Sequence, residues 1–107
     1  MEAVDKLADG YTVAEVHARR SELAGQAVAV RGKVVKANFG ILGTNWLHLR
    51  DGSGSAETGD NDLTVTSADK VEVGQVVSIR GTLALDKDFG AGYRYAVIVE
   101  DAKLWVD

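Results

Sequence analysis

The chain contains the same short pattern twice, as GQAVAVRG at residues 25–32 and as GQVVSIRG at residues 74–81. In both copies apolar residues recur at every second position, which is typical of a β-strand with one buried face. Each copy ends on a glycine, Gly32 or Gly81. A glycine within a strand pattern predicts a bulge or a tight bend, which a small closed sheet needs. We therefore interpret the two copies as strands that share one structural task.

The same alternation recurs outward from these copies, and glycine-rich breaks separate the segments. The predicted strands are residues 28–34, 46–50, 63–66, 77–85 and 93–106, and the predicted breaks are residues 40–45, 51–61 and 86–92. Five short strands with glycine turns predict a small all-β barrel. The length of 107 residues suits one domain. We expect this domain at residues 11–107, after a flexible N-terminal segment at residues 1–10.

Residues 12–24 predict a single helix before the first strand. Thr12 is suited to the N-cap position, and Glu15 three residues later completes a capping box. One helix face is predicted to carry Val13, Val16, Arg20 and Leu23. Gly25 follows the last turn and can adopt the left-handed conformation that ends many helices.

The composition excludes several classes of function. A net charge of −4 argues against a protein that coats nucleic acid non-specifically. The absence of cysteine excludes disulfides, a thiol nucleophile and Cys-ligated zinc. No apolar run approaches the roughly 20 residues that span a bilayer. The charge is uneven, because residues 12–50 carry six Lys or Arg against two Glu, whereas residues 51–107 carry five against eleven acids. A small basic face and a mixed solvated surface both fit this distribution.

Catalytic and metal-binding patterns are missing from the sequence. No GxSxG motif opens a helix after a strand, and there is no HExxH motif. No carboxylate stands at ligand spacing beside His17 or His48. The loop at residues 51–62 has oxygen-bearing side chains at alternate positions, but Ala56 replaces the glycine of an EF-hand and Asp62 its final glutamate. We expect no enzyme, no cofactor and no metal site, and a flexible acidic hairpin at this loop.

Two stretches carry a resemblance to a known fold. Residues 46–54 (WLHLRDGSG) followed by residues 62–66 (DLTVT) are similar to the strand, Asp-Gly-x-Gly, strand element of anticodon-binding-like OB-fold domains. Over most of its length, the chain also resembles small bacterial single-domain OB-fold proteins, through YTVAE (11–15), NWLHL (45–49) and DKDFGAGY (86–93). The resemblance implies a five-stranded Greek-key OB-fold barrel with one N-terminal α-helix.

The resemblance also implies a class of function. Members of this group are labelled nucleotide- or DNA-binding-like, are often exported, and some are named as accessory proteins of cytochrome c nitrite reduction. Residues 1–10 lack the basic and apolar regions of an export signal. Both a periplasmic and a cytoplasmic location therefore stay open.

The strongest candidate surface is the strand at residues 46–50 with its neighbours. If Leu47 and Leu49 face the core, Trp46, His48 and Arg50 point outward together. In OB-folds this face and two adjacent loops form the binding groove. The predicted ligand-binding residues are Trp46, His48, Arg50, Thr64, Thr66, Lys36, Phe39, Lys87, Phe89 and Tyr93. Aromatic rings stack on bases while Lys and Arg contact phosphates, so the set suits single-stranded nucleic acid or a nucleotide. Alternatively, Trp46 covers one end of the barrel and packs against the N-terminal helix.

The segment at residues 38–44 is the second candidate surface. It is predicted to be a loop, yet it holds Phe39, Ile41 and Leu42 between glycines. These apolar side chains either pack back under the barrel or contact a protein partner. The two function hypotheses are thus a non-enzymatic nucleic-acid or nucleotide-binding module and a protein-interaction or accessory protein of an exported system. In both cases we expect a monomer or a weak dimer that does not enter a membrane.

Overall fold

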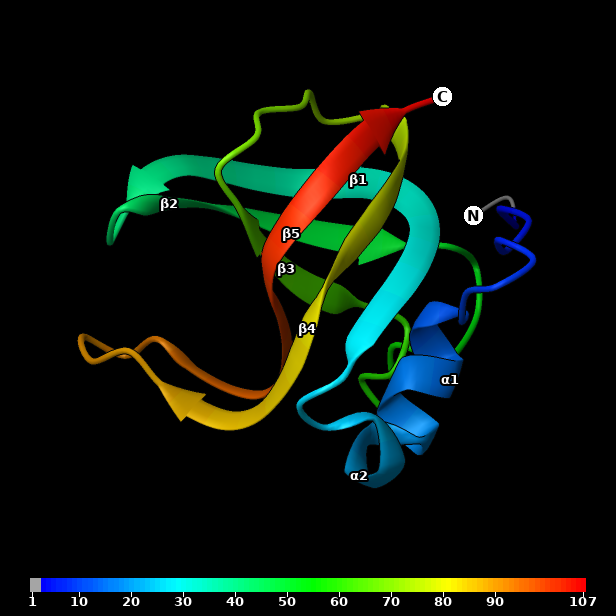
Figure 1. Ribbon diagram of the computed structural model, residues 1–107, viewed down its shortest axis with the longest axis horizontal. Helices are drawn as coiled ribbons and strands as arrows, with labels where there is room; N and C mark the ends of the chain where they lie inside the picture. Colours follow the sequence, from blue (N-terminus) through cyan, green and yellow to red (C-terminus); the bar gives the residue numbers. More distant parts are fainter. Residues whose placement is uncertain (1–2) are drawn as a thin grey trace.

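The computed structural model describes residues 3–107, which form a mainly β fold with a sheet that closes on itself (Figure 1). The strands are β1 (Ala27–Ile41), β2 (Thr44–Arg50), β3 (Leu63–Ser67), β4 (Val76–Asp88) and β5 (Arg94–Val106). Their order around the ring is β1-β2-β3-β5-β4, so β1 pairs with both β2 and β4. Only β3 and β5 are parallel. The predicted five-stranded closed sheet is confirmed.

The core lies inside the ring and is built from the alternate residues that the sequence pattern predicts. Val30 on β1, Leu47 on β2, Val65 on β3, Ile79 on β4 and Val99 on β5 are fully buried. Their neighbours along each strand face outward, because successive side chains of a strand point to opposite sides of the sheet. The outward side chains of β1 and β4 are at least partly exposed, whereas Trp46, Thr64, Thr66 and Ile98 on β2, β3 and β5 are buried.

The N-terminal helix is present but divided, so the prediction of one helix at residues 12–24 is wrong in its continuity. The chain forms α1 (Val13–Ala18) and α2 (Arg20–Leu23), with Arg19 between them at φ −103° and ψ 17°. The break lets Leu23 join the buried core while Arg20 stays exposed, so the two do not share one apolar face. The predicted capping box is confirmed. The Glu15 carboxylate accepts hydrogen bonds from the backbone N–H of Thr12 and from Lys6, and these bonds lower the pKa of Glu15.

The two glycines that end the repeated pattern, Gly32 and Gly81, have different structural roles in the sheet. Gly81 lies at an irregularity of β4 and β5, between the pairs Arg80↔Lys103 and Thr82↔Glu100. A Cβ atom at Gly81 would lie 2.7 Å from the Glu100 carbonyl oxygen, so only glycine allows this approach. Gly32 lies in regular pairing with Val77, and its Cβ would lie 3.1 Å from the Arg50 oxygen. The predicted bulge is thus confirmed at Gly81, whereas Gly32 allows a close approach of two strands.

The prediction of a loop at residues 38–44 is wrong, because β1 and β2 continue through these residues as one long hairpin. Ile41 pairs with Thr44, which leaves only Leu42 and Gly43 in the turn. Both have positive φ angles, 53° and 79°. Two-residue turns that match the twist of a hairpin require this conformation. Figure 1 shows the tip of this hairpin on the same side of the molecule as the β4–β5 hairpin, with α1 and α2 on the other side.

A buried carboxylate ties the start of α1 to the end of β2. Asp51 is 2% exposed, and its carboxylate accepts hydrogen bonds from the backbone N–H of Val13 (2.9 Å) and of Ser53 (3.0 Å). The Ser53 hydroxyl also donates to Asp51 and accepts from the N–H of Ala14. The Asp51 carbonyl accepts from the N–H of Val4, which holds part of the N-terminal segment against the ring. In its described part, 3–10, that segment has no helix or strand.

We predict that Asp51→Asn lowers the free energy of unfolding by about 1–3 kcal/mol, because one backbone donor at the start of α1 loses its acceptor in a buried position. Urea denaturation measures the change. Glu57→Gln is the control, since it removes the same charge from an exposed position of the same loop and should change stability by less than about 0.5 kcal/mol. Equal stability of the two variants would contradict the role given to Asp51.

Candidate functional site

The outer face of β2 presents two basic side chains beside one carboxylate. Leu47 and Leu49 are fully buried, and His48 and Arg50 point to the opposite side of the strand. His48 Nδ1 lies 2.7 Å from Asp62 Oδ2, and Arg50 Nε lies 3.5 Å from Asp62 Oδ1. Asp62 immediately precedes β3, which pairs with β2, and this places its carboxylate between the two bases. The outward orientation expected for His48 and Arg50 is thus the observed one.

The ionisation of Asp62 reflects these contacts. Partial burial raises the pKa of the Asp62 carboxyl, but the hydrogen bond and electrostatic attraction to the His48 ring, followed by the charge of Arg50, outweigh it, so the net pKa lies below the ordinary value. The carboxylate is therefore charged at neutral pH. It balances one of the positive charges on this face and orients the imidazole ring.

Pairing with β1 adds two lysines to the same face. Lys33 lies directly opposite Arg50, and Lys36 lies directly opposite His48. Like charges directly opposite each other on antiparallel strands are destabilising. Among residues 3–107, neither lysine forms an ion pair. On the outer face of the β1–β2 hairpin, two consecutive rows thus place basic side chains opposite each other.

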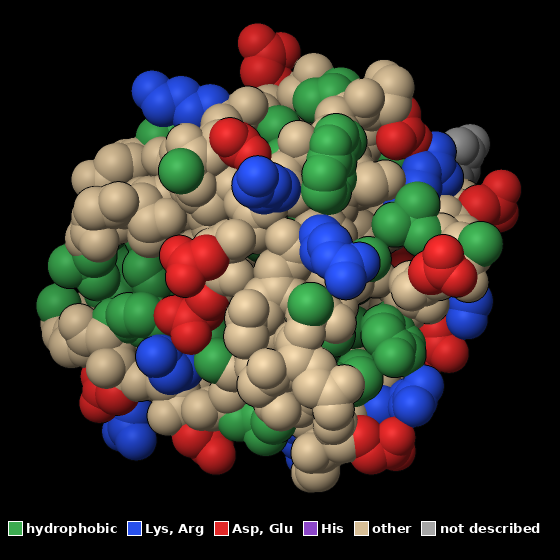
Figure 2. Space-filling model, in the orientation of Figure 1, with side chains coloured by type: hydrophobic (Ala, Val, Ile, Leu, Met, Phe, Trp, Pro, Cys, Tyr) green, Lys and Arg blue, Asp and Glu red, His purple; other side chains and the backbone are tan. Residues whose placement is uncertain are grey.

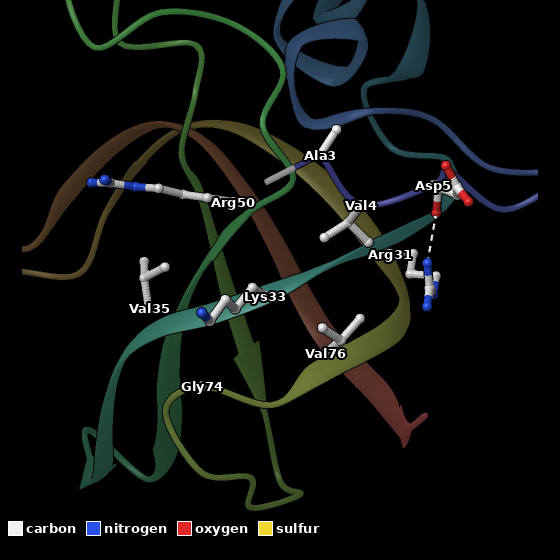
Figure 3. A pocket seen from close by; sticks show the side chains of 9 residues that line it. All are labelled: Ala3, Val4, Asp5, Arg31, Lys33, Val35, Arg50, Gly74 and Val76. Carbon is white, nitrogen blue, oxygen red and sulfur yellow. Dashed lines mark hydrogen bonds between the residues drawn. The ribbon is translucent and has the colours of Figure 1, made fainter. Parts of the chain in front are cut away.

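Two shallow hollows lie beside these rows and share Val35 and Arg50. The smaller, of about 400 Å³, is lined by Val35, Lys36, His48, Arg50 and Asp62. The larger, of about 580 Å³, is lined by Ala3, Val4, Asp5, Arg31, Lys33, Val35, Arg50, Gly74 and Val76. Figure 3 shows Lys33 and Arg50 extending from neighbouring strands, while Arg31 turns toward Asp5. Arg31 donates to the Asp5 carbonyl and forms an ion pair with Asp107, so its charge is partly satisfied.

An aromatic cluster of Trp46, Phe89, Tyr93 and Tyr95 closes the far end of this face. The Trp46 ring centroid lies 5.1 Å from Phe89 and 5.5 Å from each tyrosine. Trp46 is only 3% exposed, and its Nε1 donates to the Ile41 carbonyl at 2.7 Å. Burial, followed by the neighbouring Tyr93, raises the pKa of Tyr95. Trp46 therefore offers no open ring to a ligand in this arrangement. Its cover is the β4–β5 hairpin and not the N-terminal helix.

The other predicted ligand-binding residues are distributed over several places. Thr64 and Thr66 lie opposite His48 and Trp46 but are only 7% and 4% exposed. Lys87 forms an ion pair with Glu100 and lies 5.6 Å from the Phe89 ring centroid. Phe39 follows Asn38, the partner of Trp46, and so points to the other side of β1. The structure brings together Lys36, His48 and Arg50, and it places Phe39 elsewhere.

Three contributors to this face were missed by reasoning from the sequence. Lys33 could be found only from the register of β1 against β2, which the sequence does not specify. Tyr95 alternates with Tyr93 along one predicted strand, and this spacing was a usable signal. Asp62 was considered only as a calcium ligand, yet its carboxylate is occupied by His48 and Arg50. In the same loop Asp60 accepts hydrogen bonds from the Thr58 hydroxyl and from the Ser55 N–H, which lower its pKa.

Across residues 3–107, no group of three or more His, Cys, Asp or Glu side chains is placed to hold a metal ion. In the same part of the chain, no helix combines the length and the apolar character needed to cross a membrane.

Comparison with known proteins does not assign a family. The chain matches no family model, and no curated protein is significantly similar to it.

We predict a pH-dependent contribution of Asp62 to stability. Because its folded-state pKa is lowered, the stabilisation is present above the unfolded-state pKa of about 3.9 and is lost as pH falls through the lower folded-state pKa. The difference in unfolding free energy between the native chain and Asp62→Asn should thus shrink below about pH 4. Urea denaturation at a series of pH values measures it. Asp9→Asn, at an exposed position, is the control and should show no such trend. A constant difference for Asp62→Asn would contradict the assignment.

Proposed function

We propose that the chain is a non-enzymatic OB-fold module that binds a phosphate-bearing ligand, single-stranded nucleic acid or a nucleotide, on the outer face of β1 and β2. The strand order β1-β2-β3-β5-β4 supports the OB-fold, since β1 pairs with both β2 and β4 as in a five-stranded Greek-key barrel. The sequence resemblance to small bacterial OB-fold proteins points the same way.

The observation that carries the proposal is the pairing of Lys33 with Arg50 and of Lys36 with His48. In each pair two basic groups share one row of the sheet, and Asp62 is the carboxylate that contacts this set. A bound phosphate would accept hydrogen bonds from both members of a pair. The acidic residues of the chain lie mostly outside residues 12–50, so an overall charge of −4 does not prevent a local basic face.

The aromatic cluster has a supporting role in this proposal. Its rings hold the β4–β5 hairpin against Trp46 and so form a wall at one end of the basic face. Because Trp46 is enclosed, we assign the recognition of phosphate to the lysines and Arg50 and do not assign base stacking to Trp46.

The proposal predicts that a fluorescein-labelled oligothymidylate binds the protein at low salt and is released as salt rises. Lys33→Gln and Lys36→Gln should each weaken binding and reduce the slope of log affinity against log salt by about 1, because each removes one phosphate contact. Fluorescence anisotropy measures both quantities.

The matched control for this titration is Arg19→Gln, which removes one exposed positive charge near the helices and away from the basic face. It should leave the affinity and the salt slope close to those of the native chain. If no oligothymidylate or nucleotide binds at low salt, or if all three variants bind like the native chain, the proposed function is wrong.

A second candidate function rests on a separate apolar surface. Phe39, Val73 and Val106 are 46%, 59% and 53% exposed, and all three line a hollow of about 700 Å³. Leu42 at the hairpin tip is also exposed, whereas Ile41 is half-buried. Exposed apolar groups that gather in one place are typical of protein-interaction sites. This surface would serve an accessory protein of an exported system.

For this second function we predict that Val73→Asp and Phe39→Asp abolish association with a protein partner, because each places a charge in the apolar hollow. Chemical cross-linking in the native host, followed by measurement of the affinity for the purified partner, tests this. Lys33→Gln serves as the control and should retain the partner. A partner bound equally by all three variants would exclude this surface.

A further inference from the structure

The basic character of the outer face continues beyond β1 onto β4 and β5. Arg31 on β1 lies opposite Ser78 on β4, which in turn lies opposite Trp105 on β5. In the next row Arg80 lies opposite Lys103. Arg80 and Lys103 thus repeat on these strands the like-charged pairing of Lys33 with Arg50. Among the described residues neither forms an ion pair, whereas Arg31 is held by Asp107.

Trp105 is the exposed member of the two tryptophans. Its side chain is 53% exposed, whereas Trp46 is 3% exposed within the aromatic cluster. Leu104 packs against the core. Its neighbours along β5, Lys103 and Trp105, therefore both point to the outer face. Figure 2 shows Lys and Arg side chains beside an exposed apolar side chain over β4 and β5. A large aromatic ring that is exposed between basic groups is available for stacking with a ligand.

The outer face has one basic part at Lys33 and Arg50 and another at Arg80 and Lys103. The small side chain of Ser78 leaves the surface between them open. It lies between Arg31 and Trp105 in one row, and Arg31 also lines the hollow that contains Lys33 and Arg50. From β2 to β5 the path crosses β1 and β4, which is three strand spacings or roughly 14 Å along the sheet. One phosphate group cannot contact both ends of such a path, so a ligand that uses the whole face must be a chain of linked units.

We propose that Trp105 is a stacking platform for a base of a single-stranded nucleic acid whose backbone crosses the outer face from Arg50 and Lys33 to Arg80 and Lys103. This inference rests on the proposed function and specifies its ligand as an oligonucleotide rather than a mononucleotide. Bases stack on an exposed indole ring while phosphates pair with the flanking cations. An acidic peptide would use the cations, but its carboxylates would make no use of the flat face of the indole.

The test compares Trp105→Ala and Trp105→Phe in the anisotropy titration with fluorescein-labelled oligothymidylate. Loss of one stacked base should weaken binding roughly 5- to 100-fold in Trp105→Ala. Trp105→Phe should recover most of that loss, because it restores an aromatic face. Val106→Ala is the control, since the Val106 side chain is equally exposed but points to the opposite side of β5 from Trp105.

Intrinsic tryptophan fluorescence reports stacking separately from affinity. Unlabelled oligothymidylate should quench the native protein and should not quench Trp105→Phe, in which the remaining Trp46 is enclosed. Thymidine monophosphate, which cannot reach both ends of the face, should bind the native protein and Trp105→Ala with similar affinity. It should compete only weakly with the oligonucleotide.

The outcomes separate this inference from the proposed function. Oligothymidylate binding that depends on Lys33 but is unchanged in Trp105→Ala, without quenching, would overturn the inference and leave the proposed function standing. Absence of any binding by the native protein would overturn both. Polyglutamate is the competitor that tests for a peptide site. If it displaces the oligonucleotide, and if Trp105→Ala weakens the binding of polyglutamate as much as that of the oligonucleotide, the surface is a peptide site and the inference is wrong.

Discussion

The β-bulge at Val35 is the constraint on which the candidate binding face depends. The register of β1 against β2 shifts between Val34 and Lys36, so that one residue of β1 has no partner. In a regular strand, residues 33 and 36 would lie on opposite sides of the sheet. The bulge turns Lys36 to the side of Lys33 and sets both opposite basic residues of β2. Such bulges bend a strand and re-aim its side chains, and β1 must bend because it pairs with β2 at one end and β4 at the other.

The rest of the molecule supports this face without covering it. Asp51 fixes the start of α1 to the end of β2, which keeps both helices on the side of the ring away from the hairpin tips. The aromatic cluster holds the β4–β5 hairpin against Trp46. Asp62 offsets part of the positive charge while leaving Lys33 and Lys36 unpaired within the described chain. Two rows of like-charged residues, Lys33 with Arg50 and Arg80 with Lys103, then remain on an acidic protein, and a phosphate-bearing chain is the ligand class that we propose for them.

Much of the fold could be predicted from the sequence, and the site much less. Alternation located all the strands, and the capping box located the start of α1 at Thr12. The failures have physical causes. The 38–44 segment looked like a loop because Gly40 and Gly43 interrupt it, yet those glycines serve a bulge and a two-residue turn within one hairpin. Trp46 was expected either on a binding face or under the helix, whereas rings more than forty residues away enclose it.

The sequence by itself determined which residues alternate, where glycine permits a turn, and therefore that a small closed sheet follows a short helical segment. It also determined that His48 and Arg50 share one side of β2, since that relation depends only on the pleat of a single strand. Only the tertiary structure decided that Lys33 meets Arg50, that Arg80 lies opposite Lys103, and that Trp105 is exposed beside them. Those relations depend on strand register and on bulges, which are set by packing around the whole ring and not by any local pattern.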